Sequence, residues 1–275
     1  MNIKTLKKRI TLLLALLVSI SCEFKEENRN LISSDGSQIT TRGSGTCFPE
    51  VVDKYVYPVV PGMEEWNQAI YPDSPIKFCQ LPAGVLKSIS TPGLIDALIH
   101  APLFESFYML SSNTSALKWH QQYELFNSAG ELFKRQDAGN ALVAYYKLVC
   151  LDSECIRLSF TKSETSKPFD LFELEIHHRM LGLECLFTKQ EVLERMDHGK
   201  KKEAIAALLA NYNDYSENVN SIFPMAFIMY ADKYAPMLEY ARNHTEWFQA
   251  ILNGYLYSVD DQVNLIISFA KDFTK

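Results

Sequence analysis

The sequence lacks an excess of positive charge, and this excludes one large class of function. It contains 27 Lys and Arg against 33 Asp and Glu, which gives a net charge of −6. Proteins that bind the phosphates of nucleic acid normally carry a basic surplus. Hydrophobic residues make up 47% of the 275 positions, so a disordered chain is excluded as well, and one large domain or two ordinary ones are expected.

The motifs of common catalytic and metal sites are also missing. The sequence has no Gly-x-Ser-x-Gly, His-Glu-x-x-His, Cys-x-x-Cys, phosphate-binding glycine loop or EF-hand loop. The nearest approach to a metal motif is Glu175-Ile-His177-His178, but adjacent histidines on a helix point about 100° apart. We therefore predict no catalytic residue, no metal and no cofactor, and we expect a protein that is not an enzyme.

Long hydrophobic runs are scarce, and the run near the start is short. The apolar stretch 10–20 has 11 residues, whereas a membrane-spanning helix needs about 20. It follows a basic start and ends at small residues before Cys22, a pattern that is typical of a secretory signal peptide. We predict that residues 1–21 are a cleaved leader, whose removal takes away four basic residues and no acid. The remaining chain has 23 basic and 33 acidic residues and a net charge of −10.

Ser19, Ile20 and Ser21 before Cys22 resemble the lipobox of bacterial lipoproteins, although Leu is more usual where Ser19 stands. The resemblance implies a diacylglyceryl thioether on the Cys22 sulfur and an acylated amino group. Acyl chains such as palmitoyl anchor a protein with about 0.8 kcal/mol per buried CH₂. The alternative is a plain secreted protein in which the cysteine stands at this place by chance.

The residues after Cys22 indicate on which side of the membrane the anchor lies. Lys25 followed by Glu26 and Glu27 resembles the surface-export signal of Bacteroidetes lipoproteins, which implies an anchor on the outer face of the outer membrane. A solvated charged stretch on a periplasm-facing anchor is the alternative. Residues 22–46 are polar and rich in Gly, Ser and Thr, and they predict a flexible lipidated tether of about 25–30 Å.

Residues 47–82 hold six of the 11 prolines, which excludes long helices and predicts an irregular N-terminal cap. Cys47 and Cys79 bracket this segment, and we predict that they form a disulfide in an oxidising envelope. Apart from Cys22 the predicted mature chain has five cysteines, so at least one stays unpaired or pairs between molecules. Cys150 and Cys155 are interpreted as a local disulfide or as two buried thiols.

Residues 83–275 carry a helical pattern nearly throughout and predict an all-α domain. Thr91 followed by Pro92 predicts a helix cap and first turn, and 188–191 predicts a capping box. The alternation of apolar and polar residues over 155–161 is the one pattern that suggests a short strand.

An internal repeat is the most informative feature of this domain. Residues 131–139 and 191–199 share Glu, Arg, Asp and Gly at the same spacings, and each is followed by an Ala- and Leu-containing helix. Glu and Arg four residues apart lie on one helix face and are expected to pair. The pattern predicts stacked helical hairpins resembling an α-solenoid, and the alternative is coincidence in a helix-rich chain.

A wider resemblance rests on loose motifs. Leu81-Pro82 to Thr91, then Leu94, Leu98 and Pro102-Leu103, and the turn containing Glu131, Arg135 and Asp137 are similar to a group of all-helical lipoproteins common in gut Bacteroidetes. The resemblance implies a helical fold and an envelope location, and no activity.

Aromatic residues are the remaining indication of a binding surface. Such rings on a concave helical surface suit a peptide or sugar ligand, although most rings in helical repeats are packing residues. We predict a membrane-anchored, non-enzymatic binding or scaffold lipoprotein that recognises a protein or peptide, with a surface glycan-binding accessory lipoprotein as the alternative. The clustered aromatics are Tyr145, Tyr146, Tyr212, Tyr215, Tyr230, Tyr234, Tyr240, Tyr255, Tyr257, Trp119 and Trp247.

Overall fold

The computed structural model describes residues 47–69, 75–104, 121–150, 155–157, 168–214, 221–252 and 260–275, and these residues form helices and no β-strand. The predicted all-α fold class is confirmed. The elements are α2 (Glu64–Gln68), the 3₁₀ helix η1 (Pro75–Cys79), α3 (Ala83–Ser88), α4 (Thr91–Ile99), α7 (Asn127–Leu132), α8 (Ala138–Lys147), α10 (Phe169–Leu186), α11 (Gln190–Leu193), α12 (His198–Asp214), α13 (Ile222–Ala231), α14 (Ala235–Asn243), α15 (Thr245–Leu252) and α16 (Asp260–Phe273).

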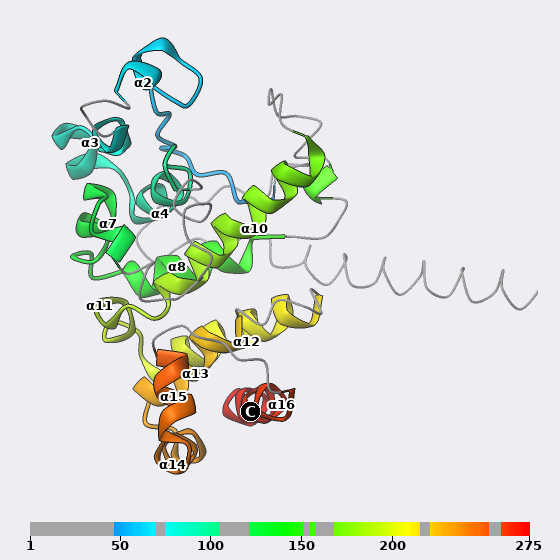
Figure 1. Ribbon diagram of the computed structural model, residues 1–275. Helices are drawn as coiled ribbons and strands as arrows, with labels where there is room; N and C mark the ends of the chain where they lie inside the picture. Colours follow the sequence, from blue (N-terminus) through cyan, green and yellow to red (C-terminus); the bar gives the residue numbers. More distant parts are fainter. Residues whose placement is uncertain are drawn as a thin grey trace, which may run out of the picture.

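α2 lies at one end of the molecule and the α13–α16 group at the other, with α4, α7, α8, α10 and α12 between them (Figure 1). α4 packs on α7 and α8, and α12 packs on α8 on one side and on α13 and α16 on the other. One hydrophobic core runs from the N-terminal segment to α16. α12 therefore joins the two halves of the molecule.

The proline-rich N-terminal segment contains short helices and is well packed. α2 and η1 have five residues each, as the proline content predicts. Tyr57 donates a hydrogen bond from its hydroxyl to the carbonyl oxygen of Ala97 in α4, 3.0 Å away. Asn127 of α7 pairs with both backbone groups of Leu81, at 2.8 and 2.9 Å. These contacts fasten the segment to the first helices.

The predicted cap of α4 is displaced by one residue. Ser90, not Thr91, is the cap, because its hydroxyl accepts a hydrogen bond from the backbone N–H of Gly93 at 3.0 Å. Thr91 lies in the first turn and donates from Oγ1 to Asp137 Oδ1, 2.8 Å away. This bond links α4 to the turn before α8.

Two further local predictions are wrong. The capping box at 188–191 does not form, because Thr188 donates from its hydroxyl to the carbonyl oxygen of Cys185 and Lys189 takes the cap position of α11. The strand suggested for 155–161 is replaced by a helical turn at residues 155–157, and the rest of that stretch lies outside the described residues.

Both copies of the internal repeat form a helix, a turn and a second helix, α7 with α8 and α11 with α12. Glu131 and Arg135 form the expected ion pair at 3.1 Å. Arg195, at the position equivalent to Arg135, instead donates from Nη1 to the carbonyl oxygens of Phe133 and, at 2.8 Å, of Arg135. The second copy is thereby joined to the turn of the first, and the regular superhelix of an α-solenoid stays a prediction.

Candidate functional site

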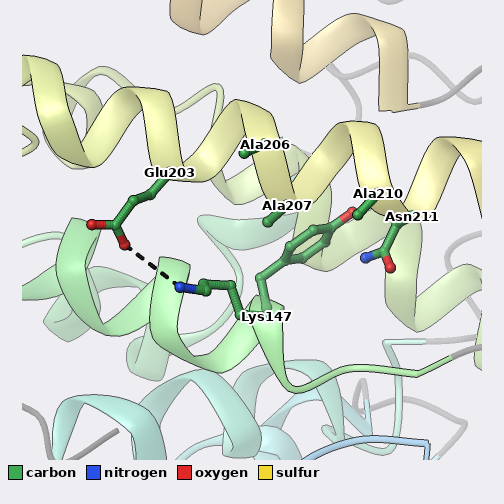
Figure 2. Close-up of a pocket in the computed structure, with 7 residues that line it drawn as sticks. Lys147, Glu203, Ala206, Ala207, Ala210 and Asn211 are labelled. Atoms are coloured by element: carbon green, nitrogen blue, oxygen red, sulfur yellow. Dashed lines mark ion pairs between the residues drawn. The ribbon is translucent and has the colours of Figure 1, made fainter. Parts of the chain in front are cut away.

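A cavity of about 270 Å³ lies between α8 and α12, the second helices of the two repeat copies. Three alanines on α12 provide its space, and Figure 2 shows them in a row between Glu203 and Asn211. Small side chains three and four residues apart leave a depression on one face of a helix. The lining residues are Tyr146 and Lys147 of α8 and Glu203, Ala206, Ala207, Ala210 and Asn211 of α12.

One end of this cavity is charged. Glu203 Oε2 lies 3.0 Å from Lys200 Nζ and 3.8 Å from Lys147 Nζ, the second pair being the dashed line in Figure 2. The Glu203 side chain is 47% exposed. Ion pairs at such exposure stabilise the fold little, so these groups can exchange partners with a ligand.

Tyr146 connects the cavity to a buried polar network. Its hydroxyl donates to Glu184 Oε1 of α10, 2.6 Å away, and Ser221 Oγ donates to the same oxygen at 2.7 Å. Glu184 is fully buried, and burial raises the pKa of its carboxyl to about 7 in spite of these two bonds. The ring of Tyr146 also packs edge-on against Phe187 at 5.4 Å. The cavity wall is therefore rigid at this point.

The neighbouring Tyr145 holds a second buried carboxylate. Its hydroxyl donates to Asp96 Oδ1 of α4 at 2.9 Å, and His100 Nδ1 lies 3.3 Å from that oxygen. Burial alone raises the pKa of Asp96, but His100, then the charge of Lys54 and then the hydrogen bond from Tyr145 outweigh it, and the pKa is lowered. Both acids lie in the core and neither lines the cavity, although Glu184 contacts its lining residue Tyr146.

The predicted site cysteines lie in different places. Cys22 is outside the described residues. Cys47 and Cys79 are both buried, and no disulfide joins these two residues in the structure. The Cys79 thiol donates to the carbonyl oxygen of Pro75 at 3.9 Å, and burial raises its pKa to about 11. The pairing of Cys47 with Cys79 stays a prediction.

The other three cysteines separate into a pair and a core residue. The Cys155 thiol lies against the sulfur of Cys150, with 3.0 Å between the two Sγ atoms. Cys185 is buried, and burial followed by the nearby Glu184 raises its pKa well above the usual thiol value. Cys185 is therefore a core residue of α10.

Of the aromatic candidates whose side chains the structure describes, half lie in the core. Tyr145, Tyr146 and Tyr240 are buried, whereas Tyr230 is 42% exposed and packs on Phe248 at 4.8 Å between ring centroids. Tyr212 and Tyr234 are half-buried. Tyr215, Tyr255, Tyr257 and Trp119 lie outside the described residues, as does the side chain of Trp247.

The two histidines on α10 have places within the packed fold. His177 Nδ1 lies 2.8 Å from the carbonyl oxygen of Glu173, one turn earlier, and His178 is buried. Within the described part of the chain, no three His, Cys, Asp or Glu side chains group as metal ligands. Every helix that the structure describes is too short or too polar to cross a bilayer.

Sequence reasoning missed the cavity and the buried Glu184. Ala206, Ala207 and Ala210 read as ordinary helix-packing residues, and their partner Tyr146 lies 60 or more positions earlier. The repeat was the one available indication, because it predicted that α8 and α12 are equivalent helices. Comparison with protein-family models, with curated proteins and with solved structures gave no match.

Proposed function

We propose that this chain is a membrane-anchored, non-enzymatic binding or scaffold lipoprotein of the bacterial cell envelope, held at the outer membrane by lipid on Cys22. Its partner is a protein or peptide that inserts one side chain between α8 and α12. The single observation that carries the binding site is the 270 Å³ cavity with an alanine-lined wall. Its volume is slightly below that of pockets for drug-sized ligands and suits one large apolar side chain.

The charges around the cavity support recognition over catalysis. Glu203 pairs with Lys147 and Lys200, so one carboxylate and two ammonium groups leave a single positive charge at the rim. A peptide backbone or a charged residue next to the inserted side chain can hydrogen-bond to them without any chemical step. Asn211, buried at the other end of the cavity, offers an amide that can orient the ligand.

A glycan reader needs a row of exposed aromatic rings. Of the six candidate tyrosines that the structure describes, Tyr230 alone is exposed and three are buried. The described tyrosines therefore favour packing, and we keep glycan binding as an outcome of the test.

Site-specific photocrosslinking tests this function. A benzophenone amino acid is placed at Ala206, an exposed residue of the cavity lining, in the full chain expressed in its native cells. The matched control carries it at Ala231, an exposed residue at the end of α13. We expect irradiation to give a discrete, protease-sensitive adduct at position 206 that is missing at position 231.

A second substitution connects the adduct to the cavity. Ala207→Phe fills the space and is expected to reduce the yield of the position-206 adduct by at least about tenfold, the loss caused by about 1.4 kcal/mol of binding. Equal adducts at 206 and 231, or an adduct that glycosidases remove and proteases do not, would contradict the proposal.

A further inference from the structure

Cys150 and Cys155 lie on either side of a short stretch after α8, with their Sγ atoms 3.0 Å apart. This separation is shorter than the van der Waals contact of two sulfur atoms. A disulfide bond is about 2.05 Å long, so a shift of about 1 Å brings the sulfurs to bonding distance. Four residues lie between the two cysteines in the sequence, so the bond would close a short loop.

The two cysteines differ in access to solvent. Cys150 is 3% exposed, whereas Cys155 is intermediate between buried and exposed. An oxidant in solution therefore reaches Cys155 first. Cys150 lies on the buried side, where it can attack the Cys155 sulfur. The backbone of Cys150 is fixed, since its N–H donates to the carbonyl oxygen of Cys47 at 2.9 Å.

We propose that Cys150 and Cys155 are a redox pair that forms an intrachain disulfide by exchange with a disulfide-bearing oxidant. The Cys155 thiolate attacks a sulfur of the oxidant and displaces one of its thiolates, which gives a mixed disulfide. The Cys150 thiolate then attacks Cys155 Sγ and releases the second oxidant sulfur as a thiol. The two cysteines lose two protons and two electrons in total, and the oxidant disulfide becomes two thiols.

The bond adds a covalent link at a junction of the fold. Cys150 follows α8, which lines the cavity with Tyr146 and Lys147, and it holds the first residue of the described N-terminal segment. This inference is independent of what the cavity binds.

Trypsin cutting after Lys147 and Arg157 gives one peptide, 148–157, that contains both cysteines and no other. The purified full chain is equilibrated with oxidised and reduced glutathione, the remaining thiols are blocked with N-ethylmaleimide, and the digest is analysed by mass spectrometry. We expect the 148–157 peptide to be unlabelled and lighter by two hydrogen atoms than the dithiol. Reduction before blocking should give two labels on the same peptide.

Three variants make the result decisive. Cys155→Ser and Cys150→Ser should each abolish the loss of two hydrogen atoms, and Cys185→Ser, in the core on α10, should leave it unchanged. Two labels on peptide 148–157 after oxidation would overturn the proposal. So would a cross-link between this peptide and peptide 43–54, which contains Cys47, or glutathione retained on Cys155.

Discussion

At the scale of single residues, the adjacent Tyr145 and Tyr146 each bind a buried carboxylate, and the two acids differ in charge. Tyr145 faces Asp96, whose pKa is lowered because His100, Lys54 and the tyrosine outweigh the effect of burial. Tyr146 faces Glu184, whose pKa burial raises from 4.5 to about 7. At neutral pH, Asp96 is therefore ionised, and the carboxyl of Glu184 is close to the midpoint of its titration.

Glu184 makes the stability of the fold depend on pH. Because its folded pKa of about 7 exceeds the unfolded value of 4.5, protonation favours the folded state. The stabilisation is fully present below pH 4.5 and is lost as pH rises through 7, a total of about 3 kcal/mol at 1.36 kcal/mol per pKa unit. We expect the urea midpoint to fall between pH 5 and pH 8. Glu184→Gln, which resembles the protonated acid, should remove most of this fall.

Exposed Glu191 of α11 provides the matched control for this experiment. Glu191→Gln should leave the fall in urea midpoint as in the parent chain. A Glu184→Gln variant with the parental pH dependence would show that Glu184 is ionised throughout this range.

Gly139 of α8 reports on the packing of the two repeat copies. A Cβ there would lie 2.4 Å from Met196 Cγ and 3.0 Å from the carbonyl oxygen of Val192. We expect Gly139→Ala to lower the free energy of unfolding by about 1–3 kcal/mol, because Met196 and the backbone of Val192 in the second copy leave no room for a methyl group. Gly130→Ala on α7, where a Cβ meets nothing within 4 Å, should be neutral or stabilise by up to about 1 kcal/mol. Equal effects in urea denaturation would contradict this packing.

At the scale of elements, Arg195 joins α11 to the turn after α7. Its guanidinium donates to the carbonyl oxygens of Phe133 and Arg135, two bonds that a shorter side chain cannot make. We expect Arg195→Ala to lower the free energy of unfolding by about 1–3 kcal/mol. Arg242→Ala, an exposed arginine of α14, should change it by less than about 0.5 kcal/mol. Matching urea midpoints for the two variants would exclude a joining role for Arg195.

Helix content could be predicted from the sequence, and helix contacts could only partly be predicted. The Glu131–Arg135 pair forms as expected, although α7 ends at Leu132 and Arg135 lies in the turn that follows it. The cap at Thr91 and the box at Thr188 failed because these hydroxyls bind Asp137 and the carbonyl oxygen of Cys185 instead. The cavity could not be predicted, because it depends on how α8 and α12 approach each other across 60 positions.

At the scale of the whole molecule, the proposed lipid anchor and the acidic helical body differ in how they interact with a membrane. In the described part of the body, the buried apolar residues form one continuous core, and the predicted mature chain carries a net charge of −10. An acidic body is repelled by anionic headgroups, so the proposed membrane attachment depends on the acyl chains predicted at Cys22. We expect Cys22→Ser to move the protein out of the membrane fraction or to leave the leader uncleaved, whereas Cys185→Ser stays membrane-bound. Immunoblots of the fractions distinguish these results.

Mass spectrometry of the N-terminal peptide from native membranes tests whether Cys22 carries the proposed lipid anchor. We expect a chain that starts at Cys22 and carries a diacylglyceryl thioether and an amide-linked acyl chain. A chain that keeps residues 1–21, or that has an unmodified thiol at Cys22, would contradict the proposal.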